Sequence, residues 1–150
     1  MTQFAVTKHV VAAPDRVWAI VTDVAHYDRV IQGITAVEQL DDLPDFGVGT
    51  TWRETRKMFG QEASEKMDVT AVDPGTSYTV NAASHGAVYT SVISLTPNGT
   101  GTDLTMTFGA EPTSSVAAIL AKTVGRVFEG ATKKALKQDL NDIARAAEAS

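Results

Sequence analysis

The segment Thr51–Arg56 carries the residues best suited to chemistry, in the order Thr-Trp-Arg-Glu-Thr-Arg. On a strand, Trp52, Glu54 and Arg56 share one face, because side chains alternate between faces. If that face borders a cavity, Glu54 could bind a ligand hydroxyl or act as a general base. The alternative is that Glu54 forms an ion pair with Arg56 at the rim of the sheet.

Glu65 repeats this situation on the following strand, where it is in phase with Met67. Two carboxylates on neighbouring strands could form an acid/base pair, although the simpler interpretation of residues 62–66 is a solvated hairpin arm.

The three histidines, His9, His26 and His85, lack a metal-binding spacing such as His-Glu-x-x-His. We therefore expect surface or capping roles for the histidines.

Several classes of chemistry are excluded by what the sequence lacks. The chain has no cysteine, which excludes disulfides, a thiolate nucleophile and cysteine-bound metals. It has no Gly-x-Ser-x-Gly elbow and no phosphate-binding loop, and Gly47-Val48-Gly49 lacks the third glycine of a dinucleotide fingerprint. The net charge of −5 argues against charge-driven binding to nucleic acid. We expect no cofactor and no metal.

Length and hydropathy predict one globular domain, residues 1–150, since 43% of the residues are apolar and 21% are charged. The N-terminal segment lacks a basic head followed by an apolar run, and no stretch approaches the ~20 apolar residues of a membrane helix. We therefore expect a cytoplasmic, bacterial-type protein without stable membrane insertion, present as a monomer or a weak homodimer.

The hydrophobic periodicity predicts mostly strands in the first two thirds of the chain. Pro14 opens one short helix, and a second short helix is expected at 24–31, ended by Gly33. Short, turn-rich separators between the strands favour an antiparallel meander. The predicted strands are 3–11, 34–40, 47–57, 61–72, 76–83, 88–96 and 102–110.

From residue 113 the period becomes helical, and it predicts one helix over 113–147. An apolar stripe lies opposite a charged stripe, so the helix is expected to lie against the sheet. Gly125 and Gly130 interrupt the pattern, which indicates either a bend or a close approach to the helix backbone.

These features together resemble a known family. The residues that carry the resemblance are Val10–Trp18 (VVAAPDRVW), Asp23, Tyr27, Gly33, Gly47-Val48-Gly49 and Asp73-Pro74. With the order of elements, they resemble the START-like or SRPBCC superfamily, the helix-grip fold of Bet v 1. Within it, the chain is most similar to the polyketide cyclase/dehydrase and lipid-transport family.

The resemblance implies an α+β helix-grip fold, in which a curved seven-stranded antiparallel sheet surrounds a long C-terminal helix and two short helices follow the first strand. It also implies an apolar cavity between sheet and helix, with His26 near its mouth. We take the more apolar phase of each strand as the inward one. The predicted ligand-binding residues are Trp52, Glu54, Met67, Tyr78, Tyr89, Phe108, Leu120, Val124 and Phe128; the alternative is that they form an ordinary core.

We expect a non-enzymatic protein that binds or transports a small hydrophobic or amphipathic ligand, such as a lipid-like, isoprenoid or polyketide-like molecule. One alternative is a cyclase, aromatase or dehydratase that uses Glu54 as acid or base, together with Tyr78 or Tyr89. A second alternative is a protein-interaction module, which would have a filled core and an exposed apolar patch.

Overall fold

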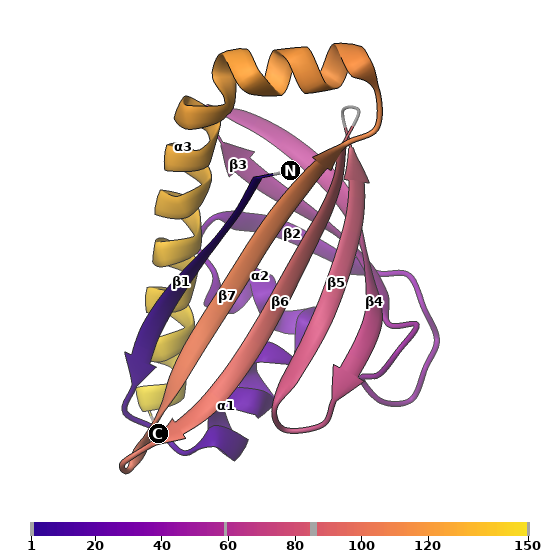
Figure 1. Ribbon diagram of the computed structural model, residues 1–150. Coiled ribbons are helices and arrows are strands. Elements are labelled where there is room, and N and C mark those ends of the chain that lie inside the picture. Colours follow the sequence, from indigo (N-terminus) through magenta and orange to yellow (C-terminus); the bar gives the residue numbers. More distant parts are fainter. Residues whose placement is uncertain (1, 59, 85–86, 150) are drawn as a thin grey trace.

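A computed structural model describes residues 2–58, 60–84 and 87–149, and the side chains of all of these except 2, 58, 84 and 116–128. Figure 1 shows one curved sheet, a long helix and a group of short helices at one end of the sheet. The elements are β1 (Thr2–Val10), α1 (Pro14–Val21), the 3-10 turn η1 (Val24–His26), α2 (Tyr27–Val30), β2 (Ile34–Gln39), β3 (Thr51–Met58), β4 (Gln61–Asp73), β5 (Ser77–Ser84), β6 (Ala87–Asn98), β7 (Gly101–Pro112) and α3 (Ser115–Glu148).

The seven strands form one antiparallel sheet in the order β1-β7-β6-β5-β4-β3-β2. Consecutive strands from β2 to β7 are neighbours, and β1 pairs with β7 at the far edge. Gly75 and Gly99 adopt positive φ angles of 79° and 64° in two of the hairpins, which is the conformation that such tight turns favour. The predicted fold class is therefore confirmed.

Two irregularities in strand pairing accompany the curvature of the sheet. The register shifts between Ile34 and Ala36 on β2, and again between Val69 and Ala71 on β4. An extra residue on one strand of an antiparallel pair bends that strand and increases its twist. Both shifts lie in the half of the sheet formed by β2 to β5, where the strands turn around the interior (Figure 1).

The short helices close one end of the interior. Pro14 begins α1, where its missing N–H needs no partner, and α1 buries Val17 and Val21. The second predicted helix is divided into η1 and α2, which ends at Val30, three residues before Gly33. Tyr27, the first residue of α2, is buried in the core that these elements share with the sheet.

Helix α3 spans 34 residues and is bent (Figure 1). Its first part crosses one end of the sheet, and its second part runs alongside β1. A Cβ atom on Gly130 would meet no heavy atom within 4 Å among the described residues, so none of them approaches the helix closely there. The bend of α3 matches one of the two expectations for the glycines, while the surroundings of Gly125 lie outside the described side chains (Figure 1).

The second part of α3 contributes the C-terminal face of the core, with Leu140, Ile143, Ala144 and Ala147 buried. Among the described residues, no helix is both long enough and apolar enough to cross a membrane.

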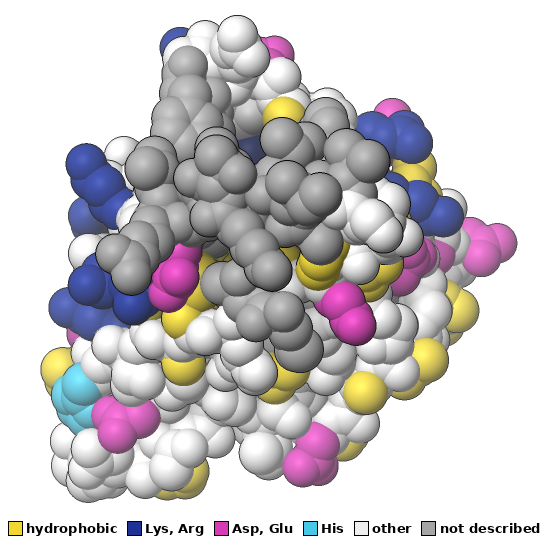
Figure 2. Space-filling view, turned by 45° about the horizontal axis from the view of Figure 1, so that its top comes forward, with side chains coloured by type: hydrophobic (Ala, Val, Ile, Leu, Met, Phe, Trp, Pro, Cys, Tyr) yellow, Lys and Arg dark blue, Asp and Glu magenta, His cyan; other side chains and the backbone are white. Residues whose placement is uncertain are grey.

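Figure 2 looks onto the end of the molecule crossed by α3. Acidic and hydrophobic side chains lie below the region that is not described, and Lys and Arg side chains lie to its left and right (Figure 2).

Candidate functional site

A cavity of about 420 Å³ lies between the concave face of the sheet and α3. Most of its wall is apolar and comes from β3 to β7, from α3 and from the short helices. The predicted residues that line it are Trp52, Glu54, Met67, Tyr78, Tyr89 and Phe108. The other three predicted residues, Leu120, Val124 and Phe128, lie outside the described side chains.

Glu54 is buried on the cavity wall, and both of its carboxylate oxygens accept hydrogen bonds. Trp52 donates from Nε1 to Oε1 at 3.0 Å, and Arg56 donates from Nε to Oε2 at 3.3 Å. The two donors flank Glu54 in phase on β3, so period-two alternation brings the three side chains together. Glu54 thus forms the predicted ion pair with Arg56, but inside the cavity wall, with 6% of its surface exposed.

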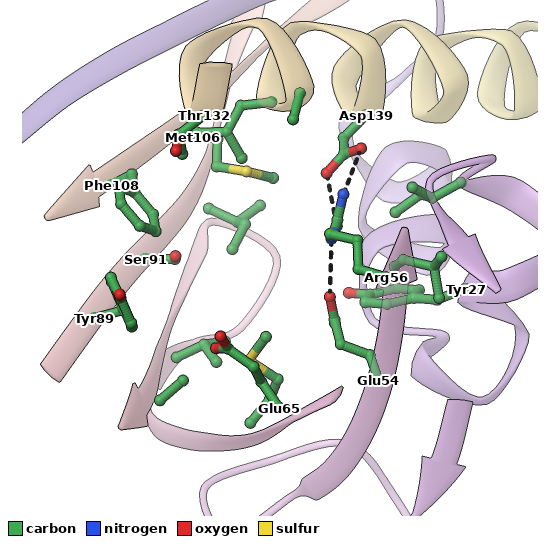
Figure 3. A pocket seen from close by; sticks show the side chains of 18 of the residues that line it. Tyr27, Glu54, Arg56, Glu65, Tyr89, Ser91, Met106, Phe108, Thr132 and Asp139 are labelled. Atoms are coloured by element: carbon green, nitrogen blue, oxygen red, sulfur yellow. Dashed lines mark hydrogen bonds and ion pairs between the residues drawn. The ribbon is translucent and has the colours of Figure 1, made fainter. Parts of the chain in front are cut away.

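Asp139 on α3 completes this cluster. The guanidinium of Arg56 donates two hydrogen bonds to it, from Nη1 to Oδ1 at 3.1 Å and from Nη2 to Oδ2 at 2.9 Å. This bidentate pair joins β3 to α3 at one side of the cavity (Figure 3). We call Glu54, Arg56 and Asp139 the charged triad.

Burial and mutual attraction oppose each other within the charged triad. Burial raises the pKa of Asp139, and the charge of Arg56 only partly offsets that effect. For Arg56, burial acts to lower the pKa, but the charges and hydrogen bonds of Asp139 and Glu54 outweigh it, and the pKa is raised. Arg56 is therefore a permanent cation held between two carboxylates.

A second polar cluster lies where α1 ends. The carbonyl of Val21 lies in the last turn of α1, where carbonyls have no partner within the helix. It accepts hydrogen bonds from the hydroxyls of Tyr27 and Tyr78, the latter at 2.8 Å. The two phenol oxygens are 2.6 Å apart. Burial raises the pKa of both tyrosines well above the ordinary value. The hydrogen bonds of both hydroxyls to the Val21 carbonyl hold the end of α1 against the sheet.

The opposite side of the cavity is aromatic. Tyr89 on β6 and Phe108 on β7 stack with ring centroids 5.6 Å apart, and Phe4 packs on the other side of Phe108. Figure 3 shows Tyr89 and Phe108 across the cavity from Arg56 and Asp139. We call Tyr89 and Phe108 the aromatic pair.

Glu65 also lines the cavity, although residues 62, 63, 64 and 66 around it are exposed, as expected for a solvated hairpin arm. It is half-buried on β4 and lies directly opposite Glu54 in strand register. The oxygens of Glu54 are engaged by Trp52 and Arg56, and Figure 3 shows Glu65 apart from the charged triad. Glu54 and Glu65 are therefore neighbours on the cavity wall, with the oxygens of Glu54 already engaged.

Two lining residues that sequence reasoning missed come from α3, namely Asp139 and Thr132. Thr132 is 8% exposed, and its Oγ1 has no hydrogen-bond partner in the described part of the chain. A signal for Asp139 existed, because it lies four residues before Ile143 and three after Leu136, on the apolar side of the helix. An acid in that position must be paired when buried.

His26 does not line the cavity. It is exposed, and its Nδ1 lies 2.9 Å from the carboxylate of Asp23. His9 is likewise exposed and pairs with Asp103 at 2.8 Å, whereas His85 lies outside the described residues. Within the residues that the structure describes, no three acidic or histidine side chains are grouped as metal ligands would be.

The chain matches one family over almost its whole length. Residues 1–148 match the family described as polyketide cyclase/dehydrase and lipid transport. Among curated proteins, a search finds no match.

Several solved structures share the fold at low sequence identity. TTHA0849 from Thermus thermophilus is 14% identical, with a TM-score of 0.81 and 97% of both chains covered. The aromatase/cyclase Zhui from Streptomyces sp. R1128 is 18% identical, with a TM-score of 0.77 over 98% of this chain and 93% of the other. Ara h 8.0201 is 16% identical, with a TM-score of 0.69 over 98% and 95%. From the family match, the chain belongs to the polyketide cyclase/dehydrase and lipid transport family.

Proposed function

We propose that this protein binds a small hydrophobic or amphipathic molecule in the cavity between the sheet and α3. The observation that carries the proposal is the cavity itself, about 420 Å³ of space with a largely apolar wall inside a small domain. Protein interiors are normally packed with few voids larger than a water molecule. A lined space of this size is typical of a ligand site.

The gain in free energy would come mainly from removing apolar ligand surface from water. Covering about 200 Å² of such surface contributes roughly 5 kcal/mol before the costs of association are subtracted. The polar groups of the wall lie at different places, among them the charged triad, Glu65, Ser91 and Thr132. They would orient an amphipathic molecule within an otherwise apolar space.

The surroundings of Glu54 support a binding role over proton transfer. A general base needs an oxygen that can reach the proton it removes. Both oxygens of Glu54 already accept hydrogen bonds from Trp52 and Arg56. Tyr78, one of the two tyrosines considered for catalysis besides Tyr89, donates its hydroxyl proton to the Val21 carbonyl. A cyclase or dehydratase mechanism based on these two residues therefore has less support.

The test is to fill the cavity and measure binding of N-phenyl-1-naphthylamine, a neutral probe that fluoresces in apolar sites. Ser91 on β6 lines the cavity, and Ser91→Phe would occupy part of it. Thr90→Phe adds a ring at the next position, on the opposite face of the same strand. We expect micromolar binding to the wild type and to Thr90→Phe, and binding at least tenfold weaker to Ser91→Phe.

Circular dichroism of each variant would first establish that the fold is retained. Equal probe affinity for Ser91→Phe and the wild type would contradict the proposal, because the probe would then bind elsewhere. No binding to any of the three proteins would also count against it.

A further inference from the structure

The charge of the cavity wall is strongly one-sided. Its charged lining residues are Glu54, Arg56, Glu62, Glu65 and Asp139, which are four carboxylates and one guanidinium among the described side chains. Arg56 forms ion pairs with both carboxylates of the charged triad. The described wall therefore offers an incoming ligand no free cation and several negative charges.

Glu65 is the carboxylate best placed to meet a ligand. It is half-buried, it lines the cavity, and within the described residues it forms no ion pair and no hydrogen bond. Glu65 lines the same cavity as the aromatic pair. Burial raises the pKa of Tyr89, and the charge of Glu65 adds a smaller contribution in the same direction. Glu65 and Tyr89 approach the cavity from different strands, β4 and β6 (Figure 3).

Thr132 is a second indication, independent of Glu65, that the cavity wall can bind a polar group of a ligand. Its side chain is 8% exposed on the wall formed by α3, and its Oγ1 lacks a hydrogen-bond partner among the described residues. Buried hydroxyls are almost always paired. Figure 3 shows Thr132 on the side of the cavity that carries Phe108, away from Arg56. A polar group of a ligand on this side would have a partner in Thr132.

From these placements we propose that the cavity prefers a ligand with a protonated amine on an apolar body, with the ammonium group beside Glu65 and the aromatic pair. An ammonium group is attracted both by a carboxylate and by the electron-rich face of an aromatic ring. A carboxylate or phosphate ligand would meet repulsion from the same groups. This inference rests on the proposed function, because it names the class of ligand for the same cavity.

The experiment compares three probes with one naphthalene body by isothermal titration calorimetry at pH 7. They are 2-(2-naphthyl)ethylamine, 2-(2-naphthyl)ethanol and 2-naphthylacetate, which are cationic, neutral and anionic. We expect the amine to bind about tenfold more tightly than the alcohol, and the acetate to bind most weakly. Glu65→Gln should weaken amine binding about tenfold and change alcohol binding less than twofold.

Two further variants separate the local effect from a general one. Glu111 is an exposed acid on β7, three residues beyond Phe108 and on the other face of the strand, so Glu111→Gln removes the same charge away from the cavity. It should leave all three affinities unchanged. Tyr89→Leu removes an aromatic face and should weaken the amine more than the alcohol.

The outcomes distinguish this inference from the proposed function. If the alcohol binds and the amine binds no more tightly, the preference for an amine is wrong and the binding function stands. The placement of the ammonium group beside Glu65 is also wrong if Glu111→Gln weakens the amine as much as Glu65→Gln does. If none of the three probes binds, both the inference and the proposed function fail.

Discussion

At the scale of single residues, Arg56 compensates the negative charges of two buried carboxylates. Glu54 and Asp139 are 6% and 4% exposed, and each is held by the guanidinium of Arg56. Removing one member of a buried ion cluster leaves an uncompensated charge, which costs more than the cluster contributes. The charged triad is therefore sensitive to the loss of its cation.

Arg56→Met is expected to lower the free energy of unfolding at pH 7 by about 3–5 kcal/mol, measured by urea denaturation. Burial already raises the folded-state pKa of Asp139, and losing Arg56 removes the main group that lowers it. The folded variant then binds more protons than its unfolded chain, so its stability falls as pH rises above the unfolded carboxyl pKa of about 4. Stability should thus recover as the pH falls from 7 toward 5.

The matched control for this prediction is the double variant Arg56→Met with Asp139→Asn. It removes one of the two stranded carboxylates and should regain part of the lost stability at pH 7. A double variant no more stable than Arg56→Met alone would show that charge burial is not the cause.

The hydroxyls of Tyr27 and Tyr78 make a different prediction, at alkaline pH. Burial raises the folded-state pKa of both groups, whereas an unfolded tyrosine ionises near pH 10. The folded state keeps protons that the unfolded chain releases, so stability falls as pH rises above about 10. Tyr78→Phe should make this decline shallower by about 1.4 kcal/mol per pH unit, measured by urea denaturation from pH 9.5 to 11.5. An unchanged slope would be inconsistent with this assignment.

At the scale of elements, the strand phases could be predicted from the sequence, because period-two alternation determines which side chains share a face. Trp52, Tyr78 and Phe108 were assigned to the inward face on this basis, and all three line the cavity. Asp139 could not be found in the same way. Its burial depends on Arg56, which is 83 residues away in the chain, and a charged residue on a helix is normally exposed.

The size of the cavity also lay beyond sequence reasoning. It depends on how far the sheet curves and on how α3 bends, and the register shifts on β2 and β4 are not visible as a sequence pattern. Glu65 illustrates the consequence. The segment around Glu65 is polar in the sequence and largely exposed in the structure, yet the side chain of Glu65 lines the cavity.

The pairing of β1 with β7 provides a test at the element scale. A Cβ atom on Gly101 would collide with the Val10 carbonyl oxygen and approach the ring of His9 to 2.9 Å. Gly101→Ala should lower the free energy of unfolding by about 1–3 kcal/mol in urea denaturation. Gly47→Ala is the control, because a Cβ atom there meets nothing within 4 Å, and its effect should stay within about 0.5 kcal/mol. Equal effects of the two changes would refute the close approach.

At the scale of the whole molecule, the fold holds a long helix against a curved sheet without filling the space between them. The charged triad connects α3 to β3 on one side of this space, and the aromatic pair lies on the other side (Figure 3). The tyrosine cluster fixes α1 at the end of the sheet. These contacts support the walls of the cavity from three directions, so it can remain open before a ligand binds.

The most direct test of ligand binding in this cavity is NMR with methyl-labelled methionine. Met67 on β4 and Met106 on β7 both line the cavity, and each gives a separate methyl signal. On titration with N-phenyl-1-naphthylamine, we predict that both signals shift and show nuclear Overhauser effects to the probe's aromatic protons. Saturable binding of the probe without such effects at either methyl would contradict the account, because the molecule would then occupy another part of the protein.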